Sequence, residues 1–415
     1  TERWHDPRFG TLWRASEDGS RDHRFERDPF GRLVREIRPD QVTIEYGYVS
    51  CRVTDCLMPG DGRAAFSVTQ REHVAGVKRG PDQIRVYDRL GRLLLQSRET
   101  LGSPGIRSHE RNSYDAAGRV VGVTRALSDS APPACRGPGS GCEWREFDAR
   151  DRMVRESYPD GGQVRLTYGA NEGLRTVVRT ETLMAAGESN GMRQQHMALD
   201  LAGRLRESRT ENGADAAAVS RYRYDAAGNL ASVEVNGTRV ATVGWDRAGS
   251  KVRLDDASAG TTLWQRNGLG EVVGVIESGG RTTRFERDAL GRVIARHRQD
   301  GASDRWQWDP DHARGALAAR SAPGFNEIYR HDADGRLVSV ETELAAPGQI
   351  AGTYQRSLAY DTAGRLVGQR FPNGVELAYR HSETGLVDAV EMNGSTLHAW
   401  HTLDAAGRPT RESLQ

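Results

Sequence analysis

Apolar residues along this chain come in short clusters separated by polar turn residues, and no cluster continues with the 3.6-residue period of an amphipathic helix. One polar phrase, Asp-x-x-Gly, recurs between the clusters and is usually followed by Arg and then Leu or Val. This phrase suits a tight turn between two antiparallel strands. The pattern therefore predicts an all-β chain of tandem hairpins with almost no helix.

The phrase repeats along the chain. Ten copies are intact, at 28–31, 88–91, 115–118, 200–203, 225–228, 246–249, 288–291, 332–335, 361–364 and 404–407. Degenerate copies lie at 267–270 and 382–385, at Asp148 with Asp151 in the Gly position, at Asp309 with His312 in that position, and around Tyr168 to Gly173. The glycines at 228, 249, 270 and 291 are each 21 residues apart, a regularity that chance does not produce. The chain is therefore a repeat protein.

The chemistry of the phrase predicts the register of each hairpin. The Asp carboxylate accepts a backbone N–H inside a type I turn, and Gly supplies the positive φ that closes the turn. The Asp then lies across from the residue after Gly, which is Arg in eight of the ten intact copies. The residue before Asp faces the residue after Arg, and we expect the two pairs on opposite faces of the sheet. In the best copies the second pair is aromatic and aliphatic: Tyr87 with Leu93, Tyr114 with Val120, Tyr224 with Leu230, and Tyr360 with Leu366.

We expect residues 1–415 to form a single β-hairpin array, loosely spaced over 1–200 and regular over 200–415. Loop-like inserts are predicted near 51–62, 128–142 and 183–191, with further interruptions at 101–108 and 345–352. The structural alternative is a β-propeller, because two 21-residue units equal one four-stranded blade.

Three of the best copies carry a family resemblance. Positions 114–120, 224–230 and 360–366 read YDAAGRV, YDAAGNL and YDTAGRL. They resemble the YD repeats of the Rhs family, and the similarity extends from about Phe25 to Arg408. The resemblance implies a spiralling antiparallel sheet that forms part of a hollow shell or cocoon. In Rhs toxins and the C component of Tc toxins such shells enclose a toxic C-terminal polypeptide, and in teneurins they act as extracellular scaffolds.

The chain departs from the Rhs pattern at its end. It lacks the segment resembling Asp-Pro-x-Gly-Leu that precedes self-cleavage in Rhs toxins, so no aspartates can be assigned to such cleavage. About fourteen or fifteen hairpins are also few for closing a large shell. Together with a start at Thr1, this leads us to expect a segment of a longer protein or a short, open array.

Composition narrows the class of protein. The chain carries 58 basic and 57 acidic residues, with a formal net charge of +1, and its only lysines are Lys78 and Lys251. This balance argues against a nucleic-acid partner and against a polybasic membrane-surface protein. No stretch approaches 18 consecutive apolar residues, so we expect no membrane span.

The four cysteines form two close pairs, Cys51 with Cys56 and Cys135 with Cys142, both within inserts. Two local disulfides suit an exported protein and are the favoured prediction. Reduced thiols are the alternative, and zinc binding is disfavoured because no Cys-x-x-Cys occurs.

Three other groups of residues could carry chemistry. His398 and His401 are three apart, which places them on opposite faces of a strand and disfavours a shared metal. Trp306 and Trp308 share a face, either as a sugar-stacking platform or, as we favour, as core packing in place of a missing Tyr. The chain contains no Gly-x-x-x-x-Gly-Lys phosphate loop, and we assign no serine to a nucleophile elbow. We therefore predict no enzyme and assign no catalytic, cofactor-binding or metal-binding residues.

The leading hypothesis is a non-catalytic scaffold of an Rhs-type secreted protein that encapsulates and helps to deliver a C-terminal toxin or effector polypeptide. Its partners would be that polypeptide, secretion machinery and a cell-surface glycan, and its location would be secreted or at the cell surface. The alternative is an extracellular adhesin that binds carbohydrate or another cell surface through the outer face or the inserts.

Overall fold

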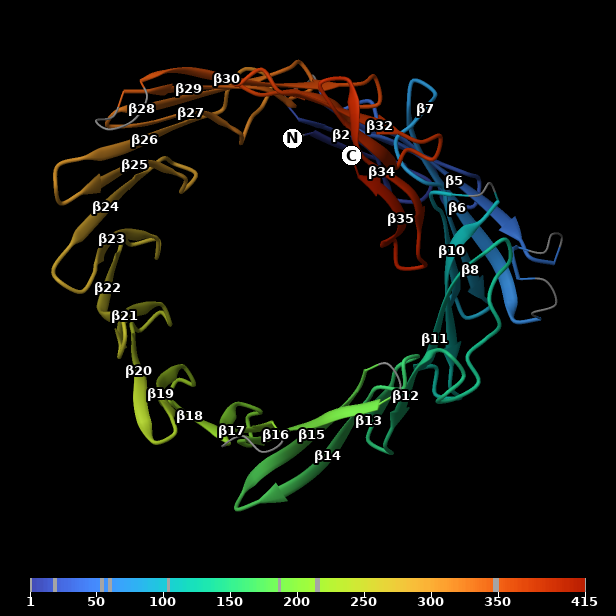
Figure 1. Cartoon of the computed structure of the whole chain (residues 1–415), viewed down its shortest axis with the longest axis horizontal. Helices are drawn as coiled ribbons and strands as arrows, with labels where there is room; N and C mark the ends of the chain where they lie inside the picture. Colours follow the sequence, from blue (N-terminus) through green and yellow to red (C-terminus); the bar gives the residue numbers. More distant parts are fainter. Residues whose placement is uncertain are drawn as a thin grey trace. The chain divides into compact units, whose positions relative to one another are not determined.

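The computed structural model describes residues 2–17, 21–52, 56–58, 62–102, 105–185, 188–212, 217–345 and 351–414. Across these residues the regular elements are 35 β-strands, joined by hydrogen bonds into one sheet without helices. Most strands that follow one another in sequence pair antiparallel, as successive colours show in Figure 1, although β8 pairs with β6 and not with β7. The all-β prediction is confirmed, and the propeller alternative is wrong because the strands are not divided into separate four-stranded blades. No helix in the described residues is long and apolar enough to cross a membrane.

The chain divides into two compact units, and unit 1 comprises Thr1–Trp144 and Gln355–Gln415. Its strands are β1 Glu2–His5, β2 Leu12–Glu17, β3 Arg21–Arg27, β4 Leu33–Ile37, β5 Thr43–Ser50, β6 Ala64–Val74, β7 Val77–Lys78, β8 Gln83–Asp88, β9 Leu93–Glu99, β10 Arg107–Tyr114, β11 Val120–Ser128, β31 Leu366–Arg370, β32 Glu376–His381, β33 Val387–Met392, β34 Ser395–Leu403 and β35 Pro409–Leu414.

Unit 2 comprises Arg145–Tyr354. Two strands, β12 Glu143–Phe147 and β30 Gly352–Tyr360, cross the boundaries between the units. The others are β13 Met153–Ser157, β14 Gln163–Asn171, β15 Leu174–Ala185, β16 Glu188–Leu199, β17 Leu205–Asn212, β18 Ala218–Tyr224, β19 Leu230–Val235, β20 Thr238–Trp245, β21 Lys251–Asp256, β22 Gly260–Arg266, β23 Val272–Ile276, β24 Thr282–Arg287, β25 Val293–Arg298, β26 Ser303–Trp308, β27 Leu317–Ala322, β28 Phe325–His331 and β29 Leu337–Leu344.

The predicted register of the Asp-x-x-Gly hairpins is confirmed. At Asp88 the Gly91 N–H donates to the Asp88 carbonyl and the Asp88 N–H donates to the Arg92 carbonyl, both at 3.0 Å. Gly91 has φ 76°, in the left-handed region that glycine enters without a Cβ clash. The four predicted cross-strand pairs all form: Tyr87 with Leu93, Tyr114 with Val120, Tyr224 with Leu230, and Tyr360 with Leu366.

The degenerate copies divide into two kinds. Asp151 occupies the Gly position with φ 60°, and its N–H donates to the Asp148 carbonyl at 3.1 Å, so this turn keeps the pattern. At Asp309 the prediction of the same turn is wrong, because the Asp309 N–H donates to the carbonyl of Ala316 and the loop spans 309–316. The copy near Tyr168 is a hairpin with a two-residue turn, in which Asn171 lies opposite Leu174.

Some of the predicted inserts form loops and others do not. Between β11 and β12, residues 129–142 form a loop, as predicted. The loop predicted at 183–191 is wrong, because β15 and β16 continue as a long hairpin with Met184 opposite Ser189, while 186–187 lie outside the described residues. Of the insert at 51–62, residues 53–55 and 59–61 also lie outside them.

The inserts help to form the hydrophobic core of unit 1. Val86, Leu94, Leu95 and Met58 are almost completely buried, with Val86 on β8, both leucines on β9 and Met58 in the 51–62 insert. Partly buried residues from both inserts pack against this cluster: Cys51, Cys56, Leu57 and Ala131. The inserts therefore cover part of one sheet face.

Candidate functional site

A recurring contact links several of the Asp-x-x-Gly turns to the next hairpin. Asp88 accepts the Arg92 Nε–H through Oδ2 at 2.7 Å and the Arg92 backbone N–H through Oδ1 at 2.9 Å. The guanidinium so fixed lies over the ring of Tyr114, 4.7 Å from its centre. The Tyr114 hydroxyl donates to the carbonyl of Leu93 at 2.8 Å. We call this set of contacts the Arg–aromatic link.

The link recurs in both units with the same geometry. Arg204 is held by Asp200 at 2.8 Å and lies 5.1 Å from the Tyr224 ring centre, and Tyr224 donates to the Leu205 carbonyl at 2.9 Å. Further sets comprise Asp28, Arg32 and Tyr48; Asp148, Arg152 and Tyr168; and Asp288, Arg292 and Trp308. Cation–π contacts of this kind add to the hydrogen bonds that hold the turn. The Asp–Arg pair is therefore part of the packing between repeats.

The residue before Asp is also a hydrogen-bond donor at some turns where it is not tyrosine. The Trp245 and Trp308 Nε1–H groups donate to the carbonyls of Leu230 and Val293 at 2.8 and 2.9 Å. Arg287 takes the same place and donates to the Val272 carbonyl. Trp and Arg at this position thus share with Tyr a side chain long enough to reach a carbonyl of the preceding repeat, where a buried backbone acceptor needs a partner. Sequence reasoning missed this role.

Trp306 and Trp308 are both partly buried. The hydrogen bond of Trp308 within the array agrees with the favoured interpretation of this residue as core packing. Arg296 lies 5.9 Å from the Trp306 ring centre. His398 and His401 bond to different partners, Glu412 and Ser413. Within the described ranges no cluster of three His, Cys, Asp or Glu side chains is placed to hold a metal ion.

Neighbouring arginines lower the pKa of Asp148 and of Asp309. Hydrogen bonds from the Arg152 side chain and backbone lower the pKa of Asp148 to about 2. The pKa of Asp309 also falls to about 2, first through the Arg292 guanidinium, which donates to both carboxylate oxygens at 2.9 and 2.7 Å. Both carboxylates are charged at neutral pH and serve as acceptors, not as proton donors.

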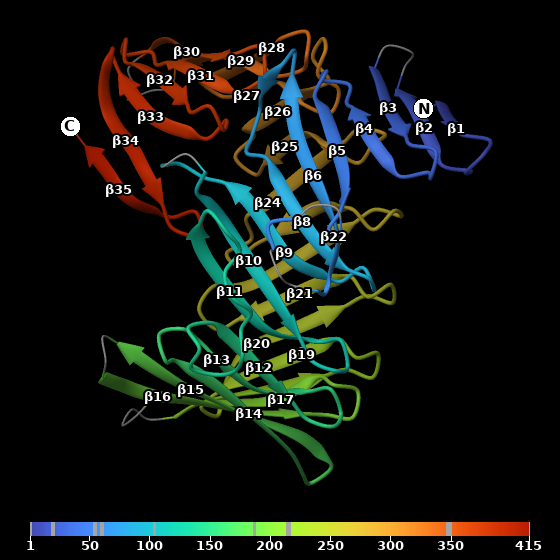
Figure 2. The ribbon, with the colours of Figure 1, turned by 90° about the vertical axis from the view of Figure 1, so that its right-hand side faces the viewer.

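Unit 1 contains a seam where parts of the chain almost 300 residues apart in sequence meet. Arg365 Nη1 donates to the Lys78 carbonyl at 2.8 Å, and Ser108 Oγ donates to the Ala405 carbonyl at 2.6 Å. Figure 2 shows the β34–β35 hairpin ending beside the start of β10. At Gly385 the backbones are so close that a Cβ would lie 2.8 Å from the Gly80 nitrogen. The seam therefore joins the last hairpins to the early ones edge to edge.

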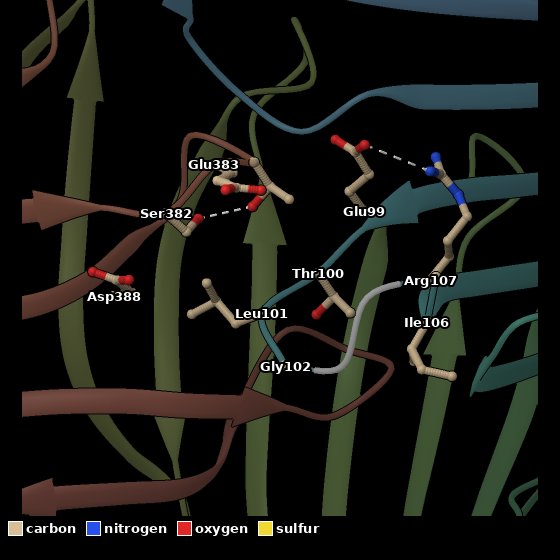
Figure 3. A pocket seen from close by; sticks show the side chains of 11 residues that line it. Glu99, Thr100, Leu101, Gly102, Ile106, Arg107, Ser382, Glu383 and Asp388 are labelled. Atoms are coloured by element: carbon tan, nitrogen blue, oxygen red, sulfur yellow. Dashed lines mark hydrogen bonds and ion pairs between the residues drawn. The ribbon is translucent and has the colours of Figure 1, made fainter.

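A cavity of about 490 Å³ lies along this seam (Figure 3). Glu99, Leu101 and Arg107 line it from the early hairpins, and Glu383 and Asp388 line it from the late ones. Arg107 is largely buried, so desolvation lowers its pKa, and it donates to Ser97 Oγ and the Asp82 carbonyl. The guanidinium of Arg107 is thus hydrogen-bonded to protein groups. We therefore interpret the cavity as a gap in the packing along the seam.

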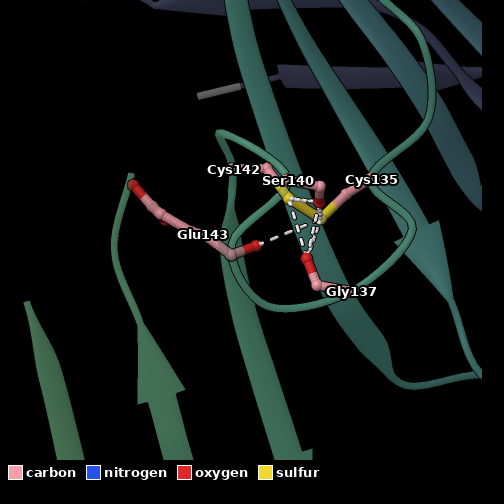
Figure 4. Close-up of a disulfide and its surroundings, with 5 residues drawn as sticks. All are labelled: Cys135, Gly137, Ser140, Cys142 and Glu143. Atoms are coloured by element: carbon pink, nitrogen blue, oxygen red, sulfur yellow. Dashed lines mark hydrogen bonds between the residues drawn. A yellow bond between two sulfur atoms is a disulfide. The ribbon is translucent and has the colours of Figure 1, made fainter. Parts of the chain in front are cut away.

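Both predicted disulfides form, Cys51–Cys56 and Cys135–Cys142. Figure 4 shows the second one within the 129–142 loop, beside Ser140 and Gly137. Cys135 lies against β11 at Gly122, where a Cβ would be only 2.6 Å from the Cys135 Cβ. The disulfide loop therefore needs glycine at position 122.

Tandem antiparallel hairpins with these turns define a class of β-repeat protein, and solved structures share the fold over 99% of this chain. They include the crystal structure of TcdB2-TccC3 without its hypervariable C-terminal region (TM-score 0.77, 13% identity) and that of TcdB2-TccC3-Cdc42 (TM-score 0.78, 12% identity). The Photorhabdus luminescens Tc holotoxin pore with a substituted TccC3 matches with a TM-score of 0.79 and 13% identity. The Rhs/YD-repeat resemblance is thus confirmed at the level of the fold.

This chain spans only 27% of the length of those solved chains. No family model matches the sequence, and no curated protein matches it.

Proposed function

We propose that this chain is a non-catalytic β scaffold that forms part of the wall of a compartment enclosing a C-terminal toxin or effector polypeptide. The observation that carries the proposal is the fold match over 99% of the chain to structures that contain TccC3, one of which is described as lacking its hypervariable C-terminal region. In this proposal both units belong to a single continuous array over residues 1–415.

The local chemistry suits a wall. Sequential antiparallel pairing leaves few unpaired strand edges, which otherwise invite association with other chains. The Arg–aromatic links tie neighbouring hairpins through side chains as well as through the backbone ladder. The aspartates and arginines of these links are hydrogen-bonded to one another and are not available as catalytic groups. This supports a structural role for the chain.

The two disulfides support an oxidising, extracellular location, because such bonds persist mainly outside the cytosol. Release through secretion machinery and display at a cell surface belong to the same proposal.

An adhesin that binds glycans is the second candidate, and Trp306 is the residue on which it depends, because the Nε1–H of Trp308 is used within the array. A glycan array probed with the protein and with Trp306→Ala tests this candidate. Saturable binding that the substitution abolishes would favour the adhesin. The containment proposal is tested by protease protection of the enclosed polypeptide in the complete gene product.

A further inference from the structure

The loop between β11 and β12 combines a fixed base with an exposed tip. At its base Pro132, Cys135 and Cys142 are buried, and Arg111 Nη1 donates to the Pro132 carbonyl at 2.6 Å. Residues 138–141 at the tip are exposed. The Cys135–Cys142 disulfide therefore closes a ring whose two ends are anchored on the sheet while its tip lies in solvent (Figure 4).

The tip has little internal structure to hold it. Its glycine-rich backbone forms one backbone–backbone hydrogen bond in the described part of the chain, from the Ser140 N–H to the Gly137 carbonyl at 3.4 Å, which is long for such a bond. A protease binds its substrate as extended chain, so a segment with few internal hydrogen bonds opens to it at small cost. Exposed loop tips with small residues are the preferred sites of proteolytic nicking.

Arg136 is the basic residue of this tip. It directly follows Cys135 and is exposed, and it makes no hydrogen bond or ion pair with any residue that the structure describes. Arginines in the tight turns are placed differently. Arg89, for example, is exposed but lies in a turn closed by the bond from the Gly91 N–H to the Asp88 carbonyl. The disulfide ring thus offers an arginine that a protease can reach without opening a hairpin.

We propose that the peptide bond between Arg136 and Gly137 is a processing site for an arginine-specific serine endopeptidase, and that the Cys135–Cys142 disulfide holds the nicked chain together until it is reduced. Hydrolysis consumes one water: the C–N bond breaks, Arg136 gains a carboxylate and Gly137 gains an amine. A dithiol reductant then gives two electrons and two protons to the disulfide and is itself oxidised to a disulfide. Processing of this loop does not depend on whether the chain encloses a polypeptide.

The position of the ring in the chain gives the nick its consequence. The chain passes between the two units twice, after Trp144 and after Tyr354. Just before the first passage, β11 pairs with β12 through two residue pairs, Gly122 with Trp144 and Val123 with Glu143. A nick without the disulfide would leave a single covalent connection between the units, with a short ladder in place of the other. The disulfide preserves the second connection.

The test is limited digestion of the complete, disulfide-bonded protein with trypsin, with the first cut identified by mass spectrometry. We expect a new N-terminus at Gly137 and two fragments that separate on a denaturing gel only after reduction. Arg136→Gln should abolish this cut. The matched control is Arg52→Gln, which removes the arginine directly after Cys51 in the other disulfide ring and should leave the cut unchanged. A first cut elsewhere, or the same cleavage in both variants, would overturn the proposal.

Stability provides the second readout. The nicked protein with its disulfide intact should keep the urea midpoint of the uncut protein, because the chain is still connected. Reduction should lower the midpoint of the nicked protein more than that of the uncut protein, since it then removes a covalent connection. Cys135 and Cys142 are only 7% and 1% exposed, so nicking should also speed their reduction. Equal effects of reduction on the nicked and uncut proteins would contradict the proposed role of the disulfide.

Discussion

The guanidinium of Arg92 lies 4.7 Å from the ring centre of Tyr114, and its Nε–H donates to the Asp88 carboxylate at 2.7 Å. One arginine therefore closes its own turn and covers the aromatic residue of the next hairpin. The near-equality of 58 basic and 57 acidic side chains is partly a consequence of this geometry, repeated along the array.

The hydroxyl of the link can be removed without changing the ring. Tyr224→Phe deletes the bond to the Leu205 carbonyl and should lower the free energy of unfolding by about 0.5–1.5 kcal/mol. The measurement is urea unfolding. Tyr222→Phe, two residues earlier on β18, is the control and should change stability less; a larger loss in the control would contradict the role of the link.

Acid should weaken the Arg–Asp contacts. The pKa of Asp309 is about 2, below its ordinary value of 3.8, so the folded state binds fewer protons than the unfolded state. This contribution is complete above about pH 4 and is lost as the pH falls towards 2. Arg292→Gln should flatten this part of the stability profile. If Arg292→Gln left the fall in stability at acid pH unchanged, the Arg292–Asp309 contact would not contribute to the pH dependence of stability.

The buried His109 predicts that stability also depends on pH in a less acidic range, between pH 7 and 5. It is fully buried on β10, and desolvation lowers its pKa below 6.5, with Arg107 nearby acting in the same direction. Because the unfolded chain binds this proton more readily, stability should fall as the pH drops below about 6.5. His109→Asn should reduce that dependence between pH 7 and 5, whereas the exposed-site control His5→Gln should retain it. Identical profiles for the two variants would refute the assignment.

A substitution at Gly122 tests how closely the loop with the Cys135–Cys142 disulfide packs against β11. In Gly122→Val the new side chain meets Cys135, so the loop must shift, at a cost of about 1–3 kcal/mol. Reduction and alkylation of Cys135 and Cys142 should become faster. Gly268→Ala, at a glycine with open space around it, is the control. No change in the rate of reduction would argue against the close contact.

Much of the array was predictable from local rules. The Asp-x-x-Gly turn sets the register, so Tyr87 opposite Leu93 followed from the spacing alone. The close spacing of Cys135 and Cys142 within one insert pointed to their disulfide.

Other features depend on contacts that spacing does not encode. The bond from Trp245 to the Leu230 carbonyl joins residues of different repeats, and no single turn reports it. The seam between Arg365 and Lys78 depends on the path of the whole unit. At 183–191 a glycine- and alanine-containing stretch predicts a loop, but backbone pairing between long strands overrides local propensity there.

Containment is the central claim, and protease protection tests it most directly. The complete gene product, with its enclosed polypeptide, is digested beside the same polypeptide expressed alone, and the decay of the intact polypeptide is followed by mass spectrometry. We predict that the polypeptide within the assembly is cut much more slowly than the free form until the assembly is unfolded with urea. Equal rates of cleavage in the native assembly and in the free form would contradict the account.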